Sequence, residues 1–256
     1  MSIRNAIITG AGRNKGIGAE ISRFLAKNGI NIYFTSFDIY DDTIGMISRH
    51  DYAKTLEECK SYGVKAHFKS FDLTSETNIK KLFSDAEEKL GNIDILINCA
   101  CYHVFDSLET ISEDLIEKNL LINSKSILLL CKEFYTRFSG DNGRIINFSS
   151  TQNLEALTTE ISYAISKATI PVITSTLSPI MASKGITINS INPGATDVGD
   201  SNDYNNHLYQ KNNLFGRLGT PEDAANLVCF LVSDNGKWIT GQTLHSEGAI
   251  IRGIEK

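Results

Sequence analysis

Short apolar runs alternate with longer amphipathic segments along the whole chain. The short runs are bounded by glycine, asparagine or proline, as is typical of buried parallel strands. We predict strands at residues 6–10, 31–35, 63–71, 93–98, 144–148, 186–191 and 242–244. The longer segments carry apolar residues at helical spacing. We predict helices at residues 19–28, 52–61, 78–90, 115–137, 163–183 and 221–232.

This alternation predicts an α/β fold, a doubly wound parallel sheet with helices on both faces. No linker or repeat divides the chain, so residues 1–256 are predicted to form a single domain. The predicted helix at 163–183 contains Pro171 and Pro179. A proline inside a helix costs about 3 kcal/mol and usually kinks it. The two prolines are therefore the weakest point of the helix predicted at 163–183.

The composition excludes several classes of partner. The 256 residues include 30 acidic and 25 basic side chains, and no lysine- or arginine-rich block stands out. Nucleic acid and anionic membrane surfaces are therefore not expected partners. No apolar run approaches the roughly 18 residues of a membrane span, and the N-terminus shows no signal-peptide pattern. The five cysteines have neither disulfide-framework nor zinc-site spacing, which predicts a cytoplasmic protein without a metal site.

The first predicted strand leads into a glycine-rich turn and then into a helix. The turn carries Gly10, Gly12, Gly16 and Gly18. Glycines let the backbone approach a pyrophosphate closely, and the positive end of the following helix attracts phosphates. A glycine-rich turn alone is a weak indication, but its place between a strand and a helix predicts a dinucleotide site.

A second stretch has the spacing Ser150-x12-Tyr163-x3-Lys167. On a helix, Tyr163 and Lys167 project from the same face, one turn apart. A nearby positive charge favours the phenolate form of a tyrosine, so Tyr163 could give and take a proton near neutral pH. Ser150 follows a predicted buried strand, from which its hydroxyl could hold a carbonyl oxygen. The alternative is an ordinary surface pair on a helix, and the spacing alone favours that alternative.

These motifs, in this order, resemble the short-chain dehydrogenase/reductase family, and most closely its 3-oxoacyl-[acyl-carrier-protein] reductases. The resemblance covers nearly the whole chain, including C-terminal signatures at residues 216–223 and 238–242. It implies a single-domain Rossmann fold. It implies a catalytic tetrad of Asn123, Ser150, Tyr163 and Lys167. It also implies cofactor contacts by Gly10, Gly12, Gly16, Ile17, Gly18, Asp72, Leu73, Asn98, Ala100, Tyr163, Lys167, Pro193, Gly194 and Thr196.

The sequence departs from the family's pattern in several places. Five residues separate Gly10 from Gly16, where the usual pattern has three. Divergent enoyl reductases have similarly long loops but place the lysine at Tyr-x6-Lys; position 170 is Ile170, so we do not expect an enoyl reductase. Cys99 and Cys101 replace Asn and Gly beside the expected nicotinamide site. We interpret these two cysteines as small, buried side chains that fill space in the core, in preference to a role in redox chemistry.

The resemblance implies hydride transfer between a nicotinamide and a carbonyl carbon. Tyr163 would then exchange the proton, Ser150 would orient the oxygen, Lys167 would bond the ribose and Asn123 would hold a water molecule. We predict an NADPH-dependent carbonyl reductase for a small-molecule carbonyl or acyl substrate, similar to 3-oxoacyl-[acyl-carrier-protein] reductases. Two alternatives stay open: a dehydrogenase of a sugar, polyol or other small secondary alcohol, and a non-catalytic regulator that senses the cofactor.

NADPH is favoured over NADH by residues near the end of the second strand. NAD-selective relatives usually carry an acidic residue there, and the corresponding residue here is Ser36. Arg13 and Lys15, in the long glycine loop, are predicted to bond a 2′-phosphate. Asp38, two residues after Ser36, could take the role of the acidic residue, so NADH stays open as the alternative cofactor.

Residues 197–213, rich in Asn and Asp, are predicted to form a substrate lid. His103 follows the nicotinamide-side strand and either touches substrate or is an exposed loop residue. The predicted helices at 115–137 and 163–183 are apolar on more than one face, and relatives pair these helices across a two-fold axis. We therefore expect a homotetramer.

Overall fold

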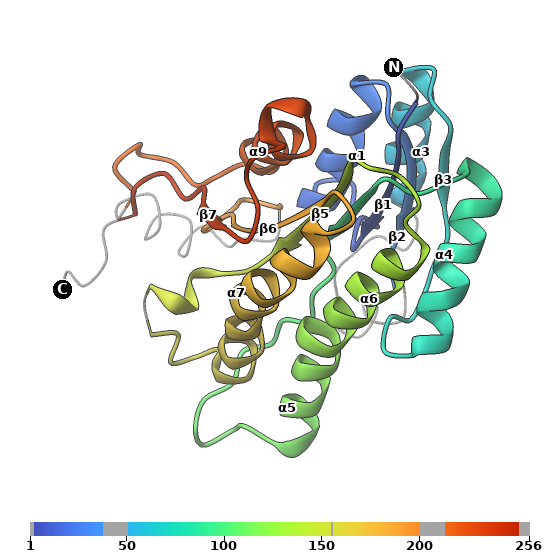
Figure 1. Cartoon of the computed structure of the whole chain (residues 1–256). Coiled ribbons are helices and arrows are strands. Elements are labelled where there is room, and N and C mark those ends of the chain that lie inside the picture. Colours follow the sequence, from blue (N-terminus) through green and yellow to red (C-terminus); the bar gives the residue numbers. More distant parts are fainter. Residues whose placement is uncertain (1–2, 38–50, 155, 200–212, 251–256) are drawn as a thin grey trace.

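Seven parallel strands form one sheet at the centre of the molecule (Figure 1). The computed structural model describes residues 3–37, 51–154, 156–199 and 213–250. The strands are β1 (Asn5–Thr9), β2 (Asn31–Thr35), β3 (Ala66–Phe68), β4 (Ile95–Asn98), β5 (Gly143–Phe148), β6 (Ile186–Asn192) and β7 (Thr243–His245). Their spatial order is β3-β2-β1-β4-β5-β6-β7, and every pairing is parallel. This confirms the doubly wound parallel sheet.

Helices cover both faces of the sheet. The longer helices are α1 (Ile17–Lys27), α3 (Tyr52–Ser61), α4 (Glu76–Leu90), α5 (Glu113–Leu120), α6 (Ile127–Arg137), α7 (Ile161–Ala182) and α9 (Pro221–Val232). Short helices are η1 (Leu121–Ser126), η2 (Thr151–Asn153) and η3 (Asp234–Gly236). Helices α1, α3 and α9 pack on one face, and α4, α6 and α7 on the other (Figure 1).

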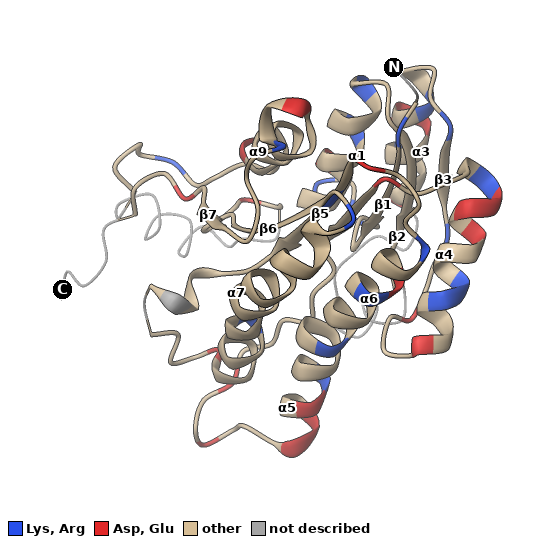
Figure 2. Cartoon of the chain, viewed as in Figure 1, with Lys and Arg blue, Asp and Glu red and all other residues tan. Residues whose placement is uncertain are grey.

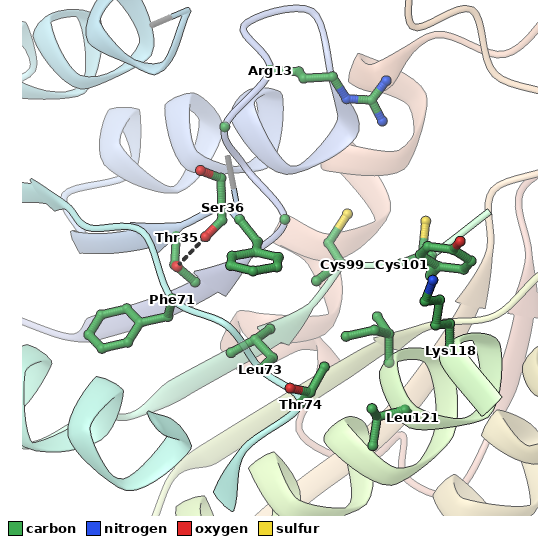
Figure 3. Close-up of a pocket in the computed structure, with 16 residues that line it drawn as sticks. Arg13, Thr35, Ser36, Phe71, Leu73, Thr74, Cys99, Cys101, Lys118 and Leu121 are labelled. Atoms are coloured by element: carbon green, nitrogen blue, oxygen red, sulfur yellow. Dashed lines mark hydrogen bonds between the residues drawn. The ribbon is translucent and has the colours of Figure 1, made fainter. Parts of the chain in front are cut away.

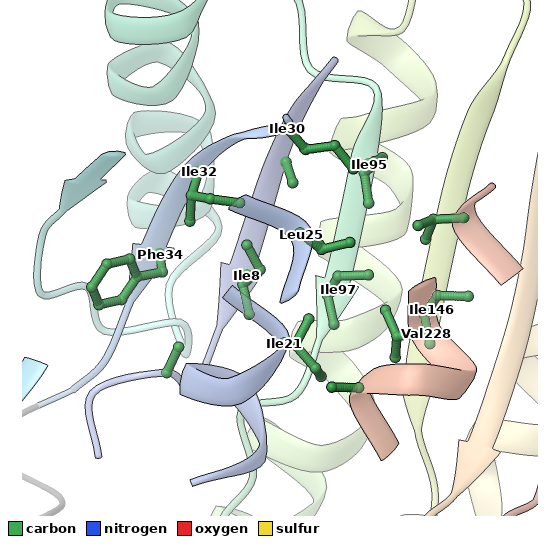
Figure 4. Close-up of a cluster of buried hydrophobic side chains, with 14 of the residues drawn as sticks. Ile8, Ile21, Leu25, Ile30, Ile32, Phe34, Ile95, Ile97, Ile146 and Val228 are labelled. Atoms are coloured by element: carbon green, nitrogen blue, oxygen red, sulfur yellow. The ribbon is translucent and has the colours of Figure 1, made fainter. Parts of the chain in front are cut away.

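The strands bury alternate residues in two separate cores, because successive side chains of a strand point to opposite faces. In β1, Ile8 packs with Leu25 of α1 and Val228 of α9 (Figure 4). Its neighbour Ile7 packs on the other face with residues such as Phe134 of α6. Strands buried on both faces read as continuous apolar runs, which is why they were recognisable in the sequence.

Helix α7 continues without a break through Pro171 and Pro179, which confirms the helix predicted at 163–183. A proline at position i leaves the carbonyl of residue i−4 without its helical donor. For Pro179 that carbonyl belongs to Ser175, and the Ser178 hydroxyl donates to it at 3.0 Å. A local side chain therefore replaces one of the lost backbone hydrogen bonds.

The predicted helix at 115–137 is continuous but not uniform. It begins at Glu113, with the Ser112 hydroxyl accepting from the Leu115 amide, and its middle turn, η1, is a π-helix. There the Ser126 hydroxyl bonds the carbonyls of Leu121 and Leu73, each at 2.8 Å. Single π turns inside α-helices occur often at functional sites. The predicted strand at 63–71 is also shorter, since only Ala66–Phe68 pair with β2.

The order of the strands reverses between β1 and β4, at the middle of the sheet. Chain connections leave these two strands in opposite directions, so their carboxyl ends border a crevice. In open α/β sheets, ligands bind in this place. The residues that follow β1, β2, β4, β5 and β6 therefore define where a site should lie.

The outward faces of most helices carry interspersed charges of both signs, whereas α7 has Lys167 as its single charged residue (Figure 2). Within the described part of the chain, no helix combines the length and apolar character needed to cross a membrane.

The signature at residues 216–223 has a structural explanation as the start of α9. Thr220 and Asp223 form a capping box, in which the Thr220 hydroxyl accepts from the Asp223 amide and the Asp223 carboxylate accepts from the Thr220 amide. Arg217 donates to both carboxylate oxygens, at 2.6 and 2.9 Å. This hydrogen bonding lowers the pKa of Asp223 to about 2.

We expect Arg217→Met to lower the melting temperature at pH 7, and the difference from wild type to shrink as pH falls from 4 towards 2. A carboxyl with a lowered folded-state pKa contributes stability above its ordinary pKa of 3.8, and this contribution is lost as the pH falls through its folded value. Thermal unfolding at several pH values checks this, with exposed Lys237→Met as the control. A difference that is constant with pH would contradict it.

Candidate active site

A cavity of about 370 Å³ lies at the carboxyl edge of the sheet, where the strand order reverses (Figure 3). Six of the residues predicted to contact the cofactor line it: Gly10, Gly12, Arg13, Ser36, Leu73 and Ala100. Phe71, Cys99, Cys101 and Tyr102 also contribute to the wall. The lining of the cavity is mostly apolar, as is common in sites for small molecules and cofactors.

The glycine loop lies against the end of β4 with no room for side chains. A Cβ atom on Gly10, whose φ is +70°, would stand 2.5 Å from the Cα of Ala100. One on Gly18 would stand 2.7 Å from the Gly10 carbonyl oxygen. The Thr9 hydroxyl accepts from the amides of Cys99 and Ala100, each at 3.2 Å, and holds the two strand ends together. The crowded glycines and the adjoining cavity fit a dinucleotide.

Arg23 of α1 holds the long glycine loop in place, which the sequence did not reveal. Its guanidinium donates to the Asn14 carbonyl at 2.9 Å and to Glu20 at 2.7 Å, and it also pairs with Glu58 of α3. The two extra loop residues are therefore supported by a network that reaches the neighbouring helix. An arginine in the second turn of a helix gives no sequence signal for this role.

The structure separates the two basic residues of the loop. Arg13 lines the cavity together with Ser36 (Figure 3). Lys15 instead lines a second hollow with Asp197 and Gly199, and a Cβ atom on Gly199 would stand 3.0 Å from the Lys15 Cδ. Of these two residues, only Arg13 therefore lines the same cavity as the end of β2.

Asp72 lies beside the cavity, and its neighbours Phe71, Leu73 and Thr74 line it. The Asp72 carboxylate accepts a hydrogen bond from the Thr74 amide at 2.9 Å. This bond gives Asp72 a local role in shaping the turn after β3, and a cofactor contact by Asp72 stays a prediction.

Lys167 is buried, with its side chain inside the molecule between α7 and β5. Its Nζ donates to the Phe148 carbonyl at 2.7 Å and lies 5.8 Å from the centre of the Tyr163 ring. Burial lowers the pKa of Lys167. Ser150 follows Phe148 by two residues, so this contact fixes α7 against the strand end that carries Ser150. Lys167, one turn after Tyr163, is thereby held against the strand that ends two residues before Ser150.

Asn123, the fourth residue of the predicted tetrad, is fully buried in the π turn η1. Its side chain accepts from the Tyr102 amide at 2.8 Å and donates to the Tyr102 carbonyl at 2.7 Å. It also donates to the Ser166 hydroxyl at 2.9 Å, and Ser166 donates to the Tyr163 carbonyl at 2.7 Å. Asn123 therefore connects the loop after β4 with the helix that carries Tyr163.

The Pro193–Thr196 segment follows β6 at the carboxyl edge of the sheet. Gly194 has a φ of +66°, and a Cβ atom there would stand 2.5 Å from the Cβ of Glu247. The Gly194 amide donates to the Asn192 side chain, which donates in turn to the Glu247 carboxylate at 2.9 Å. The Thr196 hydroxyl bonds the carbonyls of Pro193 and Gly194. The predicted lid lies mostly in residues 200–212, outside the described residues, as does Asp38.

Asn98 belongs to a buried polar group at the centre of the sheet. It donates to Asn147 of β5 at 2.8 Å, and Asn147 donates to Thr174 of α7 at 3.1 Å. These contacts tie β4, β5 and α7 together just beneath the site. Asn98 is thereby given a structural role in addition to its predicted contact with the cofactor.

Cys99 and Cys101 both line the cavity, and their sulfur atoms point to the same side (Figure 3). Burial raises the pKa of the Cys99 thiol to about 12. A protonated thiol is a poor nucleophile and metal ligand, so the packing role is favoured over redox chemistry. The described residues hold no cluster of three or more His, Cys, Asp or Glu side chains suited to a metal ion.

Residues 10–249 match the sequence model of a family described as enoyl-(acyl carrier protein) reductase. The uncharacterized oxidoreductase YjdA of Bacillus subtilis is 38% identical over 251 residues, 97% of each chain. L-rhamnose 1-dehydrogenase (NADP(+)) of Thermoplasma acidophilum is 29% identical over 261 residues, 98% of each chain. The 3-oxoacyl-[acyl-carrier-protein] reductase FabG of Aquifex aeolicus is 28% identical over 256 residues, 96% of each chain.

Solved structures have the same fold. The angucycline C-6 ketoreductase LanV with bound NADP matches with a TM-score of 0.87 and 26% identity, over 98% of this chain and 96% of LanV. A blue fluorescent protein from a metagenomic library, in complex with NADPH, matches with a TM-score of 0.85 and 26% identity, over 96% of this chain and 97% of that protein.

Proposed function

The chain belongs to the short-chain dehydrogenase/reductase family, in the group whose model is described as enoyl-(acyl carrier protein) reductase, and from this premise we propose that it is an NADPH-dependent carbonyl reductase. The observation that carries the proposal is the buried contact of Lys167 with Phe148, which brings Tyr163 and the strand end before Ser150 together. Carbonyl reduction is preferred to enoyl reduction because Tyr163 and Lys167 stand one helical turn apart.

A nicotinamide bound at the carboxyl edge would supply the hydride. Tyr163 donates its phenolic proton to the substrate oxygen in reduction and removes it in oxidation. Ser150 holds that oxygen by a hydrogen bond and keeps the carbonyl aligned. Lys167 stabilises the phenolate electrostatically, and Asn123 keeps the π turn, the Tyr102 backbone and α7 in register.

NADPH is proposed over NADH because Arg13 and Ser36 share the cavity at the end of β2. A guanidinium and a hydroxyl can both bond a 2′-phosphate, and neither repels it. Two proteins similar to this chain carry NADP in their names, L-rhamnose 1-dehydrogenase (NADP(+)) and LanV with bound NADP. These residues favour NADPH as the hydride donor, and Arg13 is proposed as the main determinant of that preference.

The substrate is proposed to be a ketone or the matching secondary alcohol. Similarity to FabG supports a 3-oxoacyl-type substrate, as the sequence motifs suggested. Similarity to L-rhamnose 1-dehydrogenase supports a hydroxylated substrate at a closely comparable level of identity. The complete Ser150, Tyr163 and Lys167 set supports turnover over a regulatory role.

Tyr163→Phe is expected to lower kcat for ketone reduction by about 10²- to 10⁴-fold, because the variant lacks the proton donor. NADPH binding, measured by the fluorescence of the nicotinamide, should stay close to wild type on the same preparation. Near-wild-type turnover by Tyr163→Phe would show that Tyr163 is not the acid.

Wild-type protein is expected to prefer NADPH, and Arg13→Ala should reduce the ratio of kcat/KM for NADPH over NADH by about tenfold, the loss of one charge-assisted bond. Lys15→Ala is the matched comparison and should change the ratio less, because Lys15 lines a different hollow. A wild-type preference for NADH, or a ratio that Arg13→Ala leaves unchanged, would contradict the assignment.

We also propose a homotetramer that pairs α7 helices across a two-fold axis. Ile165, Val172 and Ile180 are exposed on this helix, which carries a single charged residue. Leu128 of α6 is exposed as well. Light scattering should give four times the chain mass, and Val172→Glu should give smaller species. Leu108→Glu, on an exposed loop, is the control. A wild-type monomer at micromolar concentration would contradict this assembly.

A further inference from the structure

A histidine and a glutamate from different segments meet beside Tyr163. The imidazole of His103 stands nearly perpendicular to the Tyr163 ring, at 89°, with the ring centres 4.7 Å apart. Its Nε2 lies 3.3 Å from Oε2 of Glu160, the residue that precedes α7. The side chains are 36% and 20% exposed, so both remain accessible from solvent. The proposed proton transfer uses neither of them.

The position of His103 is fixed by hydrogen bonds on both sides of it in the chain. On one side, Asn123 holds both the amide and the carbonyl of Tyr102. On the other side, the backbone amide of buried Asp106 donates a hydrogen bond to the Thr159 carbonyl at 2.9 Å, and the Asp106 carboxylate accepts one from the Ser162 amide at 3.2 Å. The segment from 102 to 106 is therefore held against the start of α7, with His103 on Tyr163.

A second observation points to a polar ligand. Both polar atoms of the Gln152 amide are buried and have no hydrogen-bond partner in the described part of the chain. Gln152 follows Ser150 by two residues, in η2. Buried polar groups are almost always paired, and an unpaired amide is costly until a ligand or water satisfies it. The strand end that carries Ser150 thus holds an amide with unused donors and an unused acceptor.

We propose that His103, Glu160 and Gln152 recognise a hydroxyl group of the substrate, which makes the substrate a hydroxylated ketone or the corresponding polyol. This rests on the proposed function, since it requires the carbonyl to be held at Tyr163. A hydroxyl donates one hydrogen bond and accepts others, so an imidazole N–H and a carboxylate can satisfy both of its roles. An unsubstituted acyl chain would desolvate the Glu160 carboxylate without replacing its hydrogen bonds.

The recognition is tested with ketones that differ by one hydroxyl, such as 1-hydroxy-2-butanone and 2-butanone, reduced with NADPH. Wild-type protein is expected to have a higher kcat/KM for the hydroxylated ketone by about tenfold or more, since a site built to bond a hydroxyl rejects its deoxy analogue. His103→Phe keeps a ring against Tyr163 but removes the donor. The variant should reduce this preference by about tenfold. It should do so by lowering kcat/KM for the hydroxylated ketone while leaving kcat/KM for 2-butanone unchanged. Glu160→Gln and Gln152→Met should act in the same direction, and Leu108→Ala, at an exposed turn position, should not.

The binding of alcohols separates this proposal from the proposed function. In Tyr163→Phe protein with NADP⁺, 1,2-butanediol should bind more tightly than 2-butanol, measured by calorimetry, and adding His103→Phe should remove the difference. This result supports the recognition even where no ketone is turned over. Equal binding of the two alcohols, a preference that survives all three substitutions, or an equal loss on both ketones would each overturn the proposal. An equal loss would leave His103 with only a packing role against Tyr163.

Discussion

The site depends on one buried hydrogen bond, from the Lys167 amino group to the Phe148 carbonyl. A buried ammonium is tolerated only when it has partners, because removal from water disfavours its charged form. Burial accordingly lowers the pKa of Lys167. The contact joins the middle of the long helix α7 to the end of a central strand. Tyr163 lies one turn before Lys167 and Ser150 two residues after Phe148, so this bond links the helix that carries Tyr163 to the strand that leads into Ser150.

The surroundings of this bond are held by buried polar contacts that connect neighbouring elements. Asn147 bonds Asn98 on one side and Thr174 on the other, so β4, β5 and α7 are tied together below the site. Asn123 makes an equivalent connection on the other side, between the loop after β4 and α7. Low-dielectric surroundings strengthen such networks and make an unpaired member costly, so each network favours one arrangement of its elements.

The sequence was sufficient for the sheet, the glycine loop and the spacing of Ser150, Tyr163 and Lys167, because these features are written in local patterns. Continuous apolar runs mark strands buried on both faces, and a glycine is needed where β1 comes within contact of Ala100. The continuity of α7 was not predictable from helix propensity. The cost of Pro179 is offset by a serine hydroxyl, and the helix is also held by packing over its length. Propensity was overridden by tertiary context.

The features that escaped prediction all depend on contacts between segments distant in the sequence. Arg23 supports the glycine loop through α3, which lies more than thirty residues away and after a long connection. The π turn at Asn123 has no recognisable signature, because its stability comes from Leu73, Tyr102 and Ser166 around it.

His103 shows the same limit on the substrate side. As a residue in a loop it could be read equally as a substrate contact or as an exposed side chain. Its proximity to Glu160 arises from the pairing of Asp106 with the start of α7. The cofactor side of this site thus follows from motifs shared by many chains. The substrate side depends on contacts between distant segments, such as His103 with Glu160, and residues that distinguish substrates are therefore best sought among such contacts.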